Sequence, residues 1–143
     1  MTDDAFVIRD GDWDSLRGEA ALIRFGVFVL EQDVPEELEL DLLDPDCRHW
    51  LVHDRNGEAI ATARLAPDGQ IGRMAVLPDW RGRGVGTALL RAILAHTHES
   101  GHPRPYLHAQ EQAVGFYERA GFVAEGPLFD DAGIPHRLMR LPP

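Results

Sequence analysis

The sequence predicts a single α/β domain, and three observations carry that prediction. Asn56-Gly57 and Asp68-Gly69 separate three β-friendly runs, which is a strong short-range signal for hairpins. Apolar residues recur at helical spacing from Leu16 to Leu30, and a glycine-rich loop at 81–86 opens into a run of good helix formers. A chain of 143 residues with 44% apolar content has enough material for one hydrophobic core.

The first third of the chain is predicted to form a strand and a helix. Residues 5–8 are apolar and β-friendly, and Asp10-Gly11-Asp12 then supplies a turn and a helix cap. Pro35 limits the extension of the helix. The apolar residues of this helix are spaced four, three, four and three positions apart and so lie on one face: Leu16, Ala20, Ile23, Val27 and Leu30. Residues 31–46 carry eight carboxylates and no arginine, and are expected to form a short helix or loop with a solvated acidic face.

The rest of the chain is predicted to complete a sheet around one longer helix. The two hairpins imply an antiparallel meander. Its strands are expected at 49–54, 58–66 and 70–76. They are followed by a helix from 87 that stops near Gly101, a strand at 105–109, a helix at 112–120 ended by Gly121, and closing strands at 122–124 and 136–141.

Composition excludes several classes of function. A net charge of −10 repels nucleic acid and anionic lipid, so neither is expected as a partner. No run approaches the ~20 apolar residues of a membrane span, and the opening residues 1–4 are acidic where a signal peptide would be basic, which predicts a soluble cytoplasmic protein. All 14 basic residues are arginine. The absence of lysine excludes Schiff-base chemistry and a Walker-type phosphate loop.

The loop Arg81-Gly82-Arg83-Gly84-Val85-Gly86 carries the strongest functional signal. A strand that feeds a glycine-rich turn at the start of a helix presents several unpaired N–H groups to an anion, and diphosphate is the natural guest. The glycines allow a close backbone approach, and the two arginines add charge. Three other interpretations of the loop fit less well: a plain tight turn, a dinucleotide-binding fingerprint and an Arg-Gly RNA-binding tract. The dinucleotide fingerprint would need glycine at the position of Thr87.

Two motifs resemble those of the GCN5-related N-acetyltransferase family. The first is the run from Val76 through Pro78 and the glycine loop to Leu90, and the second is Ala113-Val114-Gly115-Phe116-Tyr117-Glu118-Arg119-Ala120-Gly121-Phe122. The segment 24–35 is similar to a bacterial branch of that family with undefined substrates. The resemblance covers nearly the whole chain. It implies a mixed, mostly antiparallel sheet, splayed at the strand 70–76 and flanked by helices, with acetyl-CoA entering on one side and an amine on the other.

The resemblance also implies roles for individual residues. Tyr117 falls beside the cofactor sulfur as a proton donor, and a backbone N–H near Ala75 or Val76 polarises the thioester carbonyl. Gln110 stands where asparagine is frequent in the family. The implied cofactor-binding set is Met74, Ala75 and Val76 for the pantetheine arm, Arg81, Gly82, Arg83, Gly84, Val85, Gly86 and Thr87 for the diphosphate, and Gln110.

The general base is left open because 70–76 lacks the glutamate that some members carry. The candidates are Glu31, Glu111, His108 and His136, of which Glu31 and His108 are assigned. No metal is expected, since His96 and His98 point to different sides of a helix and His102 lies beyond its end at Gly101. The single cysteine, Cys47, excludes an intrachain disulfide and is interpreted as a small apolar filler.

The predicted reaction is direct transfer of an acetyl group from acetyl-CoA to a small-molecule amine. The eight carboxylates of 31–46 favour a cationic acceptor, because the family builds the acceptor side of its cleft there. One alternative is an acyl-CoA-binding regulatory module without turnover. Another keeps the fold but uses a longer acyl group or the N-terminal amine of a protein. Acceptor identity, acyl length and assembly, as a monomer or a homodimer, stay open.

Overall fold

The computed structural model describes residues 5–143, and residues 1–4, the acidic opening of the chain, lie outside them. One seven-stranded sheet has the order β1-β2-β3-β4-β5-β7-β6. Every neighbouring pair is antiparallel except β4 and β5, which confirms the mixed, mostly antiparallel sheet. The strands are β1 (Phe6–Gly11), β2 (Arg48–Asp54), β3 (Ala59–Leu65), β4 (Gln70–Val76), β5 (Tyr106–Gln110), β6 (Val123–Asp131) and β7 (Ile134–Arg140).

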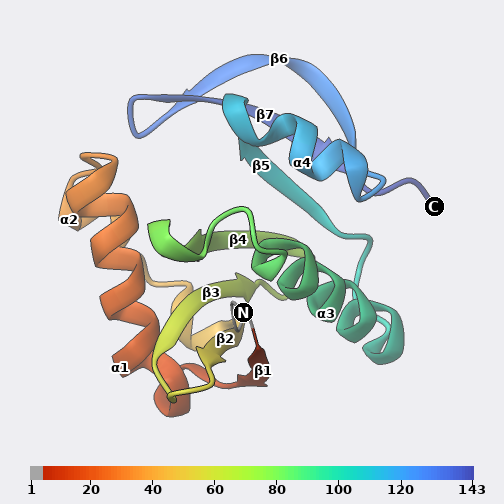
Figure 1. Ribbon diagram of the computed structural model, residues 1–143. Helices are drawn as coiled ribbons and strands as arrows, with labels where there is room; N and C mark the ends of the chain where they lie inside the picture. The colour runs from red at the N-terminus through yellow and green to blue at the C-terminus, as the bar shows by residue number, and fades with distance from the viewer. Residues whose placement is uncertain (1–4) are drawn as a thin grey trace.

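Helices cover the sheet on both faces. They are α1 (Trp13–Arg24), α2 (Glu36–Glu39), α3 (Val85–Ser100) and α4 (Val114–Arg119), with a π-helix η1 (Phe25–Glu31) and 3₁₀ turns η2 (Asp44–Asp46), η3 (Pro78–Trp80) and η4 (Glu111–Ala113). Figure 1 shows two halves, one built from β1–β4 with α1 and α3, the other from β5–β7 with α4. The two halves meet where β4 runs beside β5.

The core follows the alternation of side chains along the central strands. Trp50 and Val52 of β2 lie in one buried cluster with Leu89 and Ile93 of α3. Leu51, between them, lies in a second cluster with the apolar face of α1. Because successive strand residues point to opposite faces, α1 and α3 cover opposite faces of β2–β4.

The predicted helical face is confirmed along α1 and fails at its end. Asp12 caps the helix by accepting a 2.9 Å hydrogen bond from the Ser15 N–H. The members of the predicted face up to Val27 are buried, but Leu30 is 68% exposed. The helix widens into the π-helix after Arg24, and the wider turn rotates Leu30 away from the sheet.

Three predicted boundaries are wrong. β1 continues through Gly11, which pairs with His49, so only Asp12 of the predicted turn acts as the cap. The closing strand at 122–124 is the start of the longer β6, which resumes its pairing with β7 at Phe129 after an irregularity. The helix predicted at 112–120 is divided into the turn η4 and the helix α4. The meander and the strand at 105–109 are confirmed to within a few residues.

The expectation of a solvated acidic face at 31–46 is wrong for two of its eight carboxylates. Glu39 and Asp44 are buried. Arg24 of α1 donates to both of them, with distances of 2.8 and 3.0 Å to the two carboxylate oxygens of Asp44. Arg64 of β3 donates to Asp44 at 2.9 Å and to Asp41 at 2.7 Å. These five residues, with Arg73, form what we call the buried ion-pair network, of which Asp41 and Arg73 are the half-buried members. Glu31 is exposed and pairs with Arg81.

Candidate active site

The site begins where β4 and β5 separate. The two parallel strands pair only at Gln70 with Tyr106 and at Ile71 with Leu107, after which they diverge. This confirms the predicted splay beside the strand 70–76. From Gly72 onward the edge of β4 that faces β5 has no ladder partner among the described residues, so its backbone groups are available to a ligand.

A bulge in β4 sits at the point of separation. Arg64 pairs with Gly72 and Thr62 pairs with Ala75, so one extra residue of β4 lies between these pairs. Arg73 adopts φ of 50° there, a left-handed conformation unusual for a residue other than glycine. Its guanidinium donates to the Glu39 carbonyl at 3.0 Å and to Asp41 Oδ2 at 3.1 Å. The buried ion-pair network therefore holds the bulge against the segment after η1.

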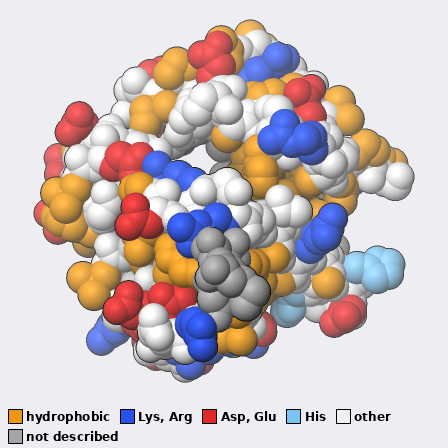
Figure 2. Space-filling view, viewed as in Figure 1, with side chains coloured by type: hydrophobic (Ala, Val, Ile, Leu, Met, Phe, Trp, Pro, Cys, Tyr) orange, Lys and Arg blue, Asp and Glu red, His pale blue; other side chains and the backbone are white. Residues whose placement is uncertain are grey.

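A cavity of about 310 Å³ lies in the opening between β4 and β5. It is lined by both halves of the protein, including Met74 of β4, His108 and Gln110 of β5, Tyr117 of α4 and His136 of β7. Figure 2 shows a hollow between the two halves, with hydrophobic side chains along one side and basic ones along the other. A cavity of this size suits a small ligand with a few polar contacts.

The glycine loop has the geometry of an anion cradle. Gly82 and Gly84 have φ of 75° and 84°, where a side chain would strain the backbone. Gly84 is the N-cap of α3 and no side chain caps this end, so the first N–H groups of the helix have no partner within it. A Cβ on Gly86 would lie 3.4 Å from the Phe116 ring, which explains the third glycine by close packing. The loop thus fits the diphosphate that the sequence predicts.

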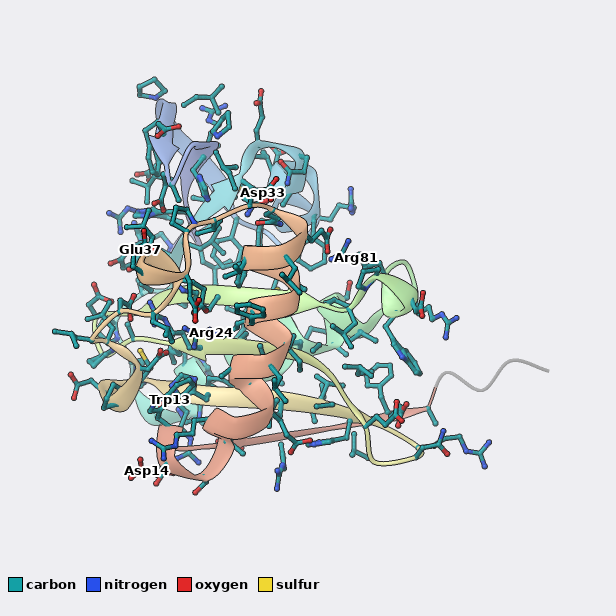
Figure 3. The ribbon with its side chains drawn as sticks, turned by 90° about the vertical axis from the view of Figure 1, so that its left-hand side faces the viewer. Trp13, Asp14, Arg24, Asp33, Glu37 and Arg81 are labelled. Atoms are coloured by element: carbon teal, nitrogen blue, oxygen red, sulfur yellow. The ribbon has the colours of Figure 1, made fainter. Side chains whose placement is uncertain are left out.

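Arg81 is placed differently from the other loop residues. Its guanidinium makes two 2.7 Å bonds to the carboxylate of Glu31, and its Nε donates to the Val76 carbonyl at 2.9 Å. Arg81 therefore joins the end of η1 to the end of β4, and its charge is shared with a carboxylate. Figure 3 shows it lying beside the helix formed by α1 and η1. Arg83 lies over the Trp80 ring at 4.9 Å, on the same exposed loop.

Tyr117 lies at the cavity wall with its hydroxyl 3.7 Å from the sulfur of Met74. It packs edge to face against Phe116 and Phe122. Burial raises the pKa of Tyr117 to about 12, so its phenol keeps its proton at every pH at which the protein would work. Tyr117 thus carries a protonated hydroxyl beside Met74 of β4, and its role as a proton donor stays a prediction.

The four candidate bases fall into two groups. His108 and His136 line the cavity, on neighbouring strands β5 and β7. Glu31 and Glu111 do not line it, and the hydrogen bonds from Arg81 lower the pKa of Glu31, which makes that carboxylate a weaker proton acceptor. Burial lowers the pKa of His108, against the opposing effect of Asp131. The geometry thus favours a histidine over Glu31.

Gln110 is engaged in a hydrogen-bonded amide pair. Its Nε2 donates to Gln32 Oε1 at 2.9 Å, and its Oε1 accepts from Gln112 at 2.6 Å. Gln32 and Arg73 both line the cavity, and neither was singled out from the sequence. The left-handed bulge that places Arg73 leaves no local sequence signal, and Gln32 gains its role only through a contact 78 residues away.

The remaining sequence expectations concern groups outside the cleft. Burial raises the pKa of the Cys47 thiol, in keeping with a filler. Among residues 5–143, no set of three histidine, cysteine or acidic side chains is arranged to hold a metal ion. In the same part of the chain, no helix is both long enough and apolar enough to cross a membrane.

Both the sequence and the fold of this chain are similar to those of known acetyltransferases and acyltransferases. A family model for the acetyltransferase (GNAT) domain matches residues 16–142. The uncharacterized N-acetyltransferase YjcF of Bacillus subtilis is 37% identical over 124 residues, covering 85% of this chain and 89% of its relative. The solved structure of an acyl-CoA N-acyltransferase from Pseudomonas aeruginosa has a TM-score of 0.84 at 30% identity, covering 96% of this chain and 100% of that one.

Escherichia coli ElaA has the same TM-score of 0.84 at 30% identity, covering 95% of this chain and 99% of the other. These matches span both predicted motifs, the splayed strands and the glycine loop. The chain therefore belongs to the GCN5-related N-acetyltransferase family of acyltransferases.

Proposed function

We propose that this protein transfers an acetyl group from acetyl-CoA to a small-molecule amine. The observation that carries the proposal is the opening between β4 and β5, with the glycine cradle beside it and a cavity of about 310 Å³ within it. Met74 of β4 and Tyr117 of α4 line the cavity, and their side chains are in contact. In the proposed reaction the thioester and the amine meet in this opening and react directly.

The proposed reaction needs two proton transfers and one polarised carbonyl. The amine nitrogen attacks the thioester carbonyl, the new N–C bond forms, and the C–S bond breaks. An N–H of the unpaired edge of β4, near Ala75 or Val76, stabilises the charge on the carbonyl oxygen. Tyr117 protonates the departing thiolate, and the proton lost by the amine passes to His108 directly or through water.

We assign the base to His108 because it lines the cavity and burial keeps its imidazole neutral near pH 7. An alkylamine with a pKa of about 10.4 is almost wholly protonated at that pH, so an acceptor for its proton is required. His136 lies on the neighbouring strand β7, and the Phe129 ring contacts both imidazoles, at 5.1 Å from His108 and 6.0 Å from His136. His136 Nδ1 lies 2.7 Å from the Ile134 carbonyl, which orients its ring.

We keep a cationic acceptor as part of the proposal. Asp131 lies on the cavity wall, whereas the charge of Glu39 there is balanced by Arg24. The test of the whole proposal is a panel of monoamines and diamines assayed for release of free CoA, with the acyl group bound to the purified protein identified by mass spectrometry. Release with a small amine supports the function. Bound acyl-CoA without release from any amine would favour the regulatory module.

Acetyl-CoA is expected to raise the melting temperature of the protein, and Gly84→Glu is expected to abolish that increase. A ligand that binds only the folded state adds about 2.7 kcal/mol at a hundredfold excess over its dissociation constant. Glutamate at position 84 places a negative charge in the cradle. Gly57→Glu is the matched control, since Gly57 has φ of 82° in a hairpin and no neighbour near its Cβ position. Both variants should melt lower, but only Gly57→Glu should keep the ligand response.

The fall of kcat at low pH, the low-pH limb of its pH profile, is expected to result from protonation of His108. Burial lowers the pKa of His108 from its ordinary value of 6.5, and the base acts when neutral, so kcat should rise with pH and have its midpoint below pH 6.5. His108→Asn should lower kcat by about 10²-fold and remove that limb. His136→Asn should keep the limb. A limb that survives in His108→Asn and disappears in His136→Asn would move the assignment to His136.

A further inference from the structure

The end of η1 contacts the loop after β4 and the strand β5 through two adjacent side chains. Glu31 is held by both terminal nitrogens of Arg81, on the cofactor side. Gln32, the next residue, pairs with Gln110 of β5, which belongs to the other half of the protein. In Figure 3 the helix of α1 and η1 rises in front of the sheet, with Asp33 at its upper end and Arg81 beside it.

The turn that carries Gln32 is fixed by its own backbone. The Gln32 N–H donates to the Val27 carbonyl at 3.1 Å, and the Val34 N–H donates to the Phe28 carbonyl at 2.9 Å. Asp33 between them has φ of 59°. Because these hydrogen bonds fix the backbone of the turn, they also fix the direction in which the Gln32 side chain points.

The pair of Gln32 and Gln110 is a reciprocal amide pair. Gln110 Nε2 donates to Gln32 Oε1 at 2.9 Å, and Gln32 Nε2 donates back to Gln110 Oε1 at 3.4 Å. Both residues line the cavity of about 310 Å³, so the pair lies across its edge. The opposite end, where β4 and β5 still pair, is already closed by the sheet. The two amides therefore bridge the cleft at the end where β4 and β5 have separated.

We propose that Gln32 and Gln110 form a clasp that limits the acceptor to slender small-molecule amines and excludes amines on folded proteins. This inference rests on the proposed function and deepens it by naming the size class of the acceptor. A protein surface cannot pass this bridge, and a bulky amine must break two hydrogen bonds to enter. The clasp should affect which amines enter the cleft and not the chemical step, because neither glutamine is a reacting group in the proposed mechanism.

The test compares two amines that differ only in bulk. One is the smallest primary amine that the parent protein acetylates, and the other is its analogue with a tert-butyl group at the end remote from nitrogen. Gln32→Ala should raise the ratio of kcat/KM for the bulky amine to that for the small amine by about tenfold. Gln112→Ala should leave the ratio at the parent value, because Gln112 bonds Gln110 without crossing the cleft. An unchanged ratio in Gln32→Ala, or an equal change in both variants, would overturn the proposal.

A second readout does not depend on turnover. Amide hydrogen exchange at residues 31–34 should speed up in Gln110→Ala and stay at the parent rate in Gln112→Ala, since only the former loses the partner of Gln32. If no amine releases CoA, the proposed function fails while this measurement still decides whether the clasp exists. Unchanged exchange in Gln110→Ala would overturn the clasp, and rapid acetylation of a folded protein by the parent would overturn its selectivity.

Discussion

Tyr117→Phe is expected to lower kcat by about 10²–10⁴-fold while leaving the affinity for acetyl-CoA close to that of the parent. The substitution removes one hydroxyl, whose only described contact is the 3.7 Å approach to the Met74 sulfur. The ring keeps its packing against Phe116 and Phe122, so the helix α4 should stay in place. Steady-state kinetics with any amine that the parent acetylates, together with calorimetric binding of acetyl-CoA, measures both quantities.

The chain supplies a matched control in Tyr106, its other tyrosine. The pKa of Tyr106 is also raised to about 12, by burial and by its hydrogen bond to Asp68. It lies on β5 at the closed end of the splay, opposite Gln70, and outside the cavity lining. Tyr106→Phe should retain kcat within a few fold. Equal rates for the parent and Tyr117→Phe would leave Tyr117 with a purely structural role.

The sheet was predictable from the sequence to the extent that its signals are local. The hairpin glycines Gly57 and Gly69 have φ of 82° and 97°, as Asx-Gly turns require, and they fix the order of three strands. The cradle was predictable for the same reason, because Gly82 and Gly84 act through their own backbone angles. The splay itself was inferred from the family resemblance, since no residue pattern marks where two strands separate.

The parts that escaped prediction depend on partners far apart in the chain. The acidic segment looked solvated because its arginine partners lie outside it, with Arg24 and Asp44 separated by 20 residues and Arg64 on another element. The exposure of Leu30 depends on the π-helix, which a 3.6-residue period does not anticipate. The pairing of Glu31 with Arg81, 50 residues later, is likewise not visible in the sequence.

Arg24→Met is expected to lower the free energy of unfolding by about 3–5 kcal/mol, the largest stability effect we predict. Arg24 is 1% exposed, and its removal leaves the carboxylates of Glu39 and Asp44 buried with one cation fewer. Methionine fills much of the same volume, so the loss reports charge more than packing. Urea denaturation followed by a spectroscopic signal gives the free energy under a two-state treatment.

The exposed pair of Arg48 and Asp10 provides the comparison. It has a similar distance, 2.8 Å, but its side chains are 43% and 39% exposed, so Arg48→Met should cost less than about 1 kcal/mol. Adding Asp44→Asn to Arg24→Met should cost less than the sum of the two single changes, because one buried unpaired charge disappears. Additive losses would show that the network does not act as a unit.

The same network should connect stability to the acceptor side of the cleft. Glu39 and Arg73 line the cavity, and Arg73 is held at the bulge of β4 by the Glu39 carbonyl and by Asp41. Loss of Arg24 leaves Glu39 its 3.9 Å pairing with Arg73 and should loosen that wall. The glycine cradle lies in the loop before α3 and at the start of that helix. Arg24→Met, assayed well below its melting temperature, should therefore raise KM for the amine more than KM for acetyl-CoA. Equal increases in the two constants would mean that the network supports the fold without shaping the acceptor wall.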